Sequence, residues 1–402
     1  MTTQGRITRV ILKNYKSIAS CDVPLGPLTI LVGPNGAGKS NFIDAMRFCR
    51  DALRTPLDQV FAKRNTNLYH LRHRSPANPE SLGMRFDFAL DGGQQGYYSF
   101  EIGPQSPRGY EVRQESCVIL DSDGERKHSF KIQAGASYSM LPAVLPAPSA
   151  NRLFLVNASG LPEYQPVYEL LSGMEFYTPD PEMMRNELDT TGSADILDAD
   201  GENVASVIDR LSHTQETTKA RIDQYLHAIV PGLDRVEAEE FRSYKLLNFY
   251  LAVAGAPQPY AFLSSAMSDG TLRALALLVA LFQNAGSDAR VSVIGIEEPE
   301  AGLHPAATAV LLDALREASA SVQVVATSQS SDLLDNAEIP VDAIRAVHWD
   351  SGETRIVPID SASRSALRDR LYTAGELLRM GSLTPEPAKS GTDAETEVQL
   401  FR

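Results

Sequence analysis

The chain of 402 residues has few cysteines and no long apolar segment. Its three cysteines, Cys21, Cys49 and Cys117, lack metal-like spacing, which argues against a disulfide scaffold and favours a reducing, cytoplasmic environment. No run approaches the roughly 18 apolar residues of a membrane-spanning helix, and the opening MTTQGRITRV lacks the charged and apolar regions of a leader. We therefore expect neither membrane insertion nor export.

Positive charge is also scarce. The chain has 37 Lys and Arg against 51 Asp and Glu, so its formal net charge is -14. Because such a molecule repels a phosphate backbone at long range, any contact with DNA must be local. The densest basic stretch, Lys63–Arg74, is the candidate for that contact, although solvated or ion-pairing arginines explain it as well.

A glycine-rich segment, LVGPNGAGKSN, satisfies the pattern G-x-x-x-x-G-K-[ST]. Glycines let backbone N–H groups point at phosphate oxygens, the lysine reaches the β- and γ-phosphates, and the hydroxyl can ligate Mg²⁺. The apolar run Pro27–Val32 predicts a strand before this loop, and Lys39–Cys49 predicts a helix after it. We assign nucleotide binding to Gly33, Pro34, Asn35, Gly36, Ala37, Gly38, Lys39, Ser40 and Asn41, and a catalytic role to Lys39.

A pair of carboxylates provides the second candidate site. The run Val291–Ile296 predicts a strand buried on both faces, and Glu297 and Glu298 follow it directly. An acid at a strand tip can hold Mg²⁺, and a second acid beside it can polarise the attacking water. We assign Glu297, with Ser40, to the metal and Glu298 to the water, although a solvated strand end would look the same in isolation.

Strand and helix patterns alternate along much of the chain, which favours an α/β fold with a parallel sheet. We interpret residues 1–142 as a β-rich first lobe that carries the phosphate loop. Residues 143–253 are interpreted as an inserted, mainly helical lid. Residues 254–383 form the expected C-terminal lobe, and the polar residues 384–402 the expected mobile tail.

Four motifs in this order, GPNGAGKSN, SSAMSDGTLRALALL, IEEPEAGLHP and VVATSQSSDLLD, resemble the RecF- and SMC-like branch of the ABC-type ATPases. The likeness is greatest to the stand-alone AAA proteins related to OLD ATPases. It implies a P-loop NTPase fold of the ABC-head type that binds ATP and Mg²⁺ and hydrolyses ATP to ADP and phosphate. The sequence has no long heptad region for SMC-type arms, and too little chain follows Thr327 for the nuclease domain of OLD proteins.

The resemblance assigns further residues. Ser268, Asp269 and Gly270 match the signature segment, which contacts the γ-phosphate held by a second copy and so implies a homodimer or higher oligomer. An ordinary helix start also explains these three residues. Gln329 stands where the family often has a γ-phosphate-sensing histidine. Because a glutamine side chain can donate a hydrogen bond but cannot take up a proton at neutral pH, we expect slow hydrolysis. Gln114 is considered as a further metal-site residue.

The resemblance alone implies what such a switch controls. It suggests bacterial antiphage defence, with a separate effector such as a nuclease. One alternative is a RecF-like DNA-repair ATPase, whose DNA-stimulated turnover would depend on Arg72 and Arg74. Another is a nucleotide-binding scaffold with very slow hydrolysis, because Gln329 and Glu297 depart from the family pattern.

Overall fold

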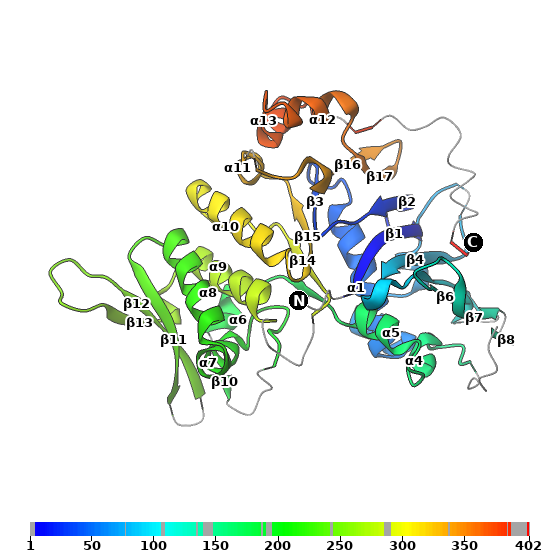
Figure 1. Cartoon of the computed structure of the whole chain (residues 1–402), viewed down its shortest axis with the longest axis horizontal. Helices are drawn as coiled ribbons and strands as arrows, with labels where there is room; N and C mark the ends of the chain where they lie inside the picture. The colour runs from blue at the N-terminus through cyan, green and yellow to red at the C-terminus, as the bar shows by residue number, and fades with distance from the viewer. Residues whose placement is uncertain are drawn as a thin grey trace. The chain divides into compact units, whose positions relative to one another are not determined.

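The structure is a computed structural model of the chain (Figure 1). It describes residues 5–76, 78–105, 109–133, 136–139, 148–185, 188–189, 195–241, 244–284, 291–336, 338–383, 385–386 and 400–401. The predicted mobile tail therefore lies almost entirely outside the described residues.

Two compact units make up the chain. The first comprises Met1–Met174, Pro340–Arg368 and Gly381–Arg402, and the second Glu175–Ile339 and Asp369–Met380. These boundaries fall at other positions than those of the predicted lobes and lid, which remain a prediction. Among the described residues, no helix has the length and apolar character needed to cross a membrane.

The first unit contains a seven-stranded antiparallel sheet in the order β2-β1-β4-β5-β6-β7-β8. Its strands are β1 Arg6–Tyr15, β2 Ile18–Pro24, β4 Leu82–Ala89, β5 Gln95–Pro104, β6 Tyr110–Leu120, β7 Arg126–Gln133 and β8 Ala136–Ser139. Alternate residues of β4 are buried, and Phe86 lies opposite the buried Tyr98 on β5. This alternation confirms the strands predicted for the β-rich first lobe.

A second set of strands in this unit carries the phosphate loop. Strand β3, Leu28–Val32, is fully buried and runs parallel to β16, Ile344–Asp350, which pairs antiparallel with β17, Glu353–Pro358. The loop joins β3 to helix α1, Lys39–Arg54, whose apolar face is buried. The other helices of this unit are α2 Leu57–Lys63, α3 Leu68–Leu71, α4 Leu155–Ala158, α5 Gln165–Ser172 and α12 Ser361–Arg368, with the 3₁₀ turns η1 Asp91–Gly93 and η3 Val341–Ala343.

In the second unit, strand β14, Val293–Glu297, runs parallel to β15, Gln323–Ser328, and β9, Met174–Tyr177, lies next to β14. Its helices are α6 Pro181–Arg185, α7 Val204–Thr214, α8 Glu216–Ile229, α9 Asp269–Phe282, α10 Pro305–Ala318, α11 Ser331–Leu334 and α13 Ala374–Arg379, with the turn η2 Ser264–Ala266. The strand-helix alternation predicted between residues 269 and 327 is confirmed.

An antiparallel sheet completes this unit. Its strands are β10 Leu188–Asp189, β11 Leu233–Phe241, β12 Tyr244–Leu251 and β13 Tyr260–Leu263, and β12 pairs with the other three. The block that we predicted to be mainly helical therefore also contains strands. The acid-rich sequence of β11 has little strand propensity, but cross-strand contacts with the aromatic residues of β12 stabilise it in the sheet.

Candidate nucleotide-binding site

The loop between β3 and α1 has the backbone that its glycines predict. Gly36 and Gly38 have positive φ angles of 77° and 101°, which residues other than glycine rarely adopt. A Cβ atom on Gly33 would lie 2.0 Å from the carbonyl oxygen of Val347, so β16 approaches too closely for any side chain there. Lys39 is only 5% exposed, and its Nζ donates to the carbonyl oxygens of Gly33 at 2.8 Å and Pro34 at 3.0 Å. The lysine is thus held inside the loop.

A chain of hydrogen bonds braces this loop from outside the motif. The Thr354 hydroxyl on β17 donates to the Ala37 carbonyl at 2.8 Å and lies 2.6 Å from the Ser17 hydroxyl, which accepts from the Asn41 amide at 2.6 Å. A Cβ atom on Gly38 would meet Thr354 Oγ1 at 2.0 Å. Sequence reasoning missed Thr354, because a single threonine in a C-terminal strand carries no motif.

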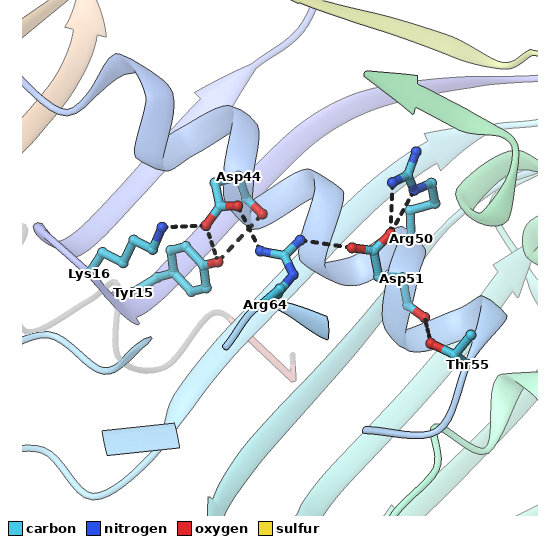
Figure 2. Close-up of polar contacts among 7 residues, drawn as sticks. All are labelled: Tyr15, Lys16, Asp44, Arg50, Asp51, Thr55 and Arg64. Atoms are coloured by element: carbon cyan, nitrogen blue, oxygen red, sulfur yellow. Dashed lines mark hydrogen bonds and ion pairs between the residues drawn. The ribbon is translucent and has the colours of Figure 1, made fainter. Parts of the chain in front are cut away.

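Charged residues form a second network that includes Asp44 and Asp51 of α1 (Figure 2). The Asp44 carboxylate accepts from Tyr15 at 2.7 Å and forms ion pairs with Lys16 at 2.6 Å and Arg64 at 2.7 Å. Arg64 also donates to Asp51 at 2.9 Å. Burial alone would raise the Asp44 pKa, but the charges of Arg64 and Lys16 hold it below its usual range. Arg64, which belongs to the basic stretch Lys63–Arg74, is thus engaged in the fold together with Lys16.

The remainder of the basic stretch is also partly engaged. His73 is buried, with its Nδ1 atom 2.9 Å from the Lys16 carbonyl oxygen. Arg72 donates to the Pro79 carbonyl at 2.9 Å, and the guanidinium groups of Arg72 and Arg74 lie over the Tyr69 ring. Arg74 and Tyr69 are exposed. DNA contact through Lys63–Arg74 remains a prediction, now confined to its exposed side chains.

The two predicted acids lie at the end of β14 in the second unit. Glu297 is half-buried and ends the strand, and Glu298 follows with a positive φ of 46°, an unusual angle for a residue with a side chain. The Glu298 N–H donates to both the carbonyl and the hydroxyl oxygen of Thr327, each at 3.1 Å. The Gln329 amide donates to Glu298 Oε2 at 3.0 Å. The structure therefore brings together two of the predicted catalytic residues.

Glu300 is a further acid at this strand end, and sequence reasoning missed it. The residue is only 8% exposed, and its Oε1 accepts from the Ser328 hydroxyl at 2.6 Å. Burial raises the Glu300 pKa, whereas the hydrogen bond from Ser328 and nearby backbone N–H groups oppose that shift. Because surface acids are common in such sequences, only the structure distinguishes this buried one.

The predicted signature residues lie where α9 begins. Ser268 is the N-cap, and its hydroxyl accepts from the Thr271 N–H at 3.2 Å. Arg185 donates to Asp269 Oδ1 at 2.6 Å. A Cβ atom on Gly270 would lie 2.4 Å from the carbonyl oxygen of Gly302, so the helix start packs directly on the loop that follows β14.

Two metal-site predictions gain no geometric test. Gln114 lies within β6 opposite Glu101, and its assignment to a metal remains a prediction. The Ser40 hydroxyl is exposed in the first turn of α1. Among the residues that the structure describes, no group of three or more His, Cys, Asp and Glu side chains could hold a metal ion. The assignment of Mg²⁺ to Ser40 and Glu297 also remains a prediction.

A phosphate loop between a buried strand and a helix, together with acids at the end of a parallel strand, defines a P-loop NTPase. The chain belongs to the family described as "AAA domain, putative AbiEii toxin, Type IV TA system", whose profile matches residues 28–335. The expected resemblance is therefore confirmed.

Solved structures confirm the expected fold. An SMC head bound to the C-winged helix domain of ScpA is similar with a TM-score of 0.56 at 16% identity, over 90% of this chain and 99% of that chain. A Pyrococcus furiosus SMC head with an extended coiled coil, bound to the C-terminal domain of ScpA, is similar with a TM-score of 0.54 at 13% identity, over 92% of this chain and 100% of that one. The chain thus has the ABC-type head fold.

Two curated proteins are similar in shorter segments. The structural maintenance of chromosomes protein 1 of Schizosaccharomyces pombe is 30% identical over 145 residues, 32% of this chain and 11% of that protein. The OLD nuclease of Thermus scotoductus is 48% identical over 40 residues, 10% of this chain and 8% of that protein. The chain therefore spans about a tenth of the length of these relatives.

Proposed function

We propose that this protein is an ABC-type switch that binds ATP with Mg²⁺, dimerises around it and reopens after hydrolysis. The observation that carries the proposal is the phosphate loop, with its positive-φ glycines and its buried Lys39. Several loop N–H groups and one lysine ammonium supply the positive charge that a triphosphate requires.

The chain's own residues divide the remaining work. Ser40 and Glu297 supply oxygen ligands of the kind that Mg²⁺ prefers, and the ion when bound would neutralise charge on the phosphates. Glu298 would orient the attacking water and accept its proton. Gln329 donates a hydrogen bond that would hold the Glu298 carboxylate for that role. Its amide would not itself act as an acid or a base.

Dimerisation would complete each site. The N-cap Ser268 and the start of α9 present N–H groups and a positive helix end that favour an anion. In the proposed dimer, this segment of one copy faces the nucleotide of the other. Hydrolysis would remove the shared γ-phosphate and with it the contact that holds the copies together.

Three proteins test this proposal: the wild type, Lys39→Ala and Glu298→Gln. The wild type should bind ATP with Mg²⁺ and release phosphate. Lys39→Ala should lose binding, measured by calorimetry, and Glu298→Gln should bind normally but turn over about a hundredfold more slowly. Light scattering should show a dimer of Glu298→Gln with ATP and a monomer of Lys39→Ala. A wild type without affinity for ATP, or one that stays monomeric when saturated, would refute the switch. Equal near-zero turnover of wild type and Glu298→Gln would favour the non-hydrolysing scaffold.

We further propose that the switch acts in bacterial defence through a separate effector such as a nuclease. The family description names an AbiEii toxin and a type IV toxin–antitoxin system, and one relative is an OLD nuclease. Cells that carry the gene and its neighbours should resist phage, and Lys39→Ala should abolish that resistance. DNA-stimulated turnover that disappears in Arg72→Ala/Arg74→Ala would instead favour the DNA-repair alternative.

A further inference from the structure

The proposed function gives no role to the buried carboxyl group of Glu300. This residue follows Glu298 by two residues, and its Oε2 atom is buried without a hydrogen-bond partner among the described residues. The N–H groups of Gln329 and Ser330 lie near enough to lower its pKa, yet they form no hydrogen bond of normal geometry with Oε2. Burying an incompletely hydrogen-bonded carboxyl group destabilises a fold, and an apolar side chain of similar size would avoid that loss. Packing alone therefore does not explain an acid at this position.

Glu300 instead organises the turn that follows β15. Its Oε1 accepts the Ser328 hydroxyl proton at 2.6 Å, which leaves Ser328 Oγ to accept from the Ser330 N–H at 3.0 Å. Ser330 Oγ in turn caps α11, accepting from Asp332 N–H at 3.2 Å and Leu333 N–H at 3.5 Å. The Glu300 carboxyl group is thus the buried end of a series of hydrogen bonds that runs through the turn between β15 and α11.

Gln329 is the central residue of that turn. Its side chain is exposed, and among the residues that the structure describes its side-chain hydrogen bond to Glu298 is the contact that orients it. The Glu298 backbone is already fixed by Thr327. The direction of the Glu298 carboxylate therefore depends on Gln329, and the position of Gln329 depends on the turn held by Glu300.

We propose that Glu300 is a positioning residue for ATP hydrolysis, which holds the Ser328–Ser330 turn so that Gln329 orients the Glu298 carboxylate. This inference rests on the proposed function, because it assigns Glu300 a role in the same reaction. It predicts an effect on turnover without a matching effect on ATP binding, since Glu300 is buried and is not among the residues that we propose to bind the nucleotide.

Steady-state kinetics test the proposal. Glu300→Ala and Ser328→Ala should each lower kcat about tenfold to a hundredfold and change the KM for ATP less than about threefold, as expected when a reacting group is displaced by about 1 Å. Glu300→Gln should restore kcat to within about threefold, because its amide oxygen can still accept from Ser328. Glu338→Ala, which removes an exposed glutamate of the same unit, is the matched control and should leave kcat unchanged.

A double variant separates positioning from general destabilisation. If Glu300 acts through Gln329, Glu300→Ala should lower kcat less than about twofold further in a Gln329→Ala background. The inference would be overturned if Glu300→Ala and Ser328→Ala both had the kcat of the wild type. It would also be overturned if Glu300→Ala lowered kcat in the Gln329→Ala background as much as in the wild type.

Hydrogen–deuterium exchange provides a readout that does not depend on ATP turnover. Peptides that cover residues 328–334 should exchange at least about tenfold faster in Glu300→Ala and Ser328→Ala than in the wild type and Glu338→Ala. Unchanged exchange would overturn the inference even if the protein hydrolyses ATP. Faster exchange in a protein without ATPase activity would refute the proposed function and the catalytic role of Glu300, while confirming that Glu300 holds the turn.

Discussion

Glu115 makes the stability of the first unit depend on pH. This glutamate of β6 is fully buried, and its carboxyl group accepts from the Tyr98 hydroxyl at 2.8 Å, the Phe154 N–H at 2.6 Å and the Leu155 N–H at 2.8 Å. Burial raises its pKa from the usual 4.5 to about 7, although these three donors act in the opposite direction. The folded protein therefore keeps a proton that the unfolded chain loses.

The sign and size of the effect follow from this difference in pKa. Below pH 4.5 both states are protonated, so the contribution of Glu115 to stability is fully present. As pH rises toward 7, the unfolded state releases its proton first, and the free energy of unfolding falls. Above pH 7 the loss levels off at about 3 kcal/mol, most of which accumulates between pH 5 and pH 8.

Urea unfolding of the wild type and Glu115→Gln at pH 5 and pH 8 measures this contribution. The single tryptophan, Trp349, lies in the same unit as Glu115 and is 53% exposed, so its fluorescence reports on that unit. The stability advantage of wild type over Glu115→Gln should shrink by about 2 to 3 kcal/mol from pH 5 to pH 8. Glu111→Gln on the same strand is the control, and its difference from wild type should change by less than about 0.5 kcal/mol. A wild-type advantage over Glu115→Gln that is constant or grows with pH would refute the reasoning.

Two further substitutions test features that no motif reveals. Thr354→Val removes the hydroxyl that hydrogen-bonds the phosphate loop and keeps the volume of the side chain. It should weaken ATP binding about tenfold, measured by calorimetry. Unchanged affinity would show that this hydrogen bond is dispensable. Arg64→Ala should lower the free energy of unfolding by about 2 kcal/mol, because it leaves the largely buried Asp44 with fewer partners. Arg74→Ala, which removes an exposed arginine of the same stretch, is the control and should lower it by less than about 0.5 kcal/mol. Equal effects of these two arginine variants in urea titrations would contradict the proposed division of the basic stretch.

Local pattern was sufficient to predict much of the fold. The strand before the phosphate loop, helix α1 and the helix Asp269–Phe282 could be predicted because apolar periodicity and capping residues lie within the segments themselves. Strand β11 could not be predicted, because its second half, EAEEF, is extended through its pairing with β12 and not through its own strand propensity. Elements determined by their local sequence could therefore be predicted, whereas a strand that depends on pairing with another strand could not.

The candidate site shows this limit more sharply. Lys39 and Glu298 belong to contiguous motifs whose spacing has a chemical reason, so they could be named from the sequence. Thr354 lies in none of the four motifs, and Glu300 lies in IEEPEAGLHP, where we assigned the chemistry to the two preceding acids. Their contacts with Ala37 and Ser328 are tertiary, so the sequence does not show them. The role of Lys16 in the Asp44 network was also hidden, because a lysine at a strand end resembles any solvated surface charge.

The hydrogen bond between Thr354 and Ala37 joins residues that are 317 positions apart in the chain. During synthesis, the glycine-rich segment emerges from the ribosome long before the hairpin that supports it. A nascent polypeptide that ends before this hairpin would lack the hydrogen bond from Thr354 to the phosphate loop, and we expect it to bind nucleotide less tightly. Translation itself would in this way delay the first ATP-driven cycle until β16 and β17 have been made.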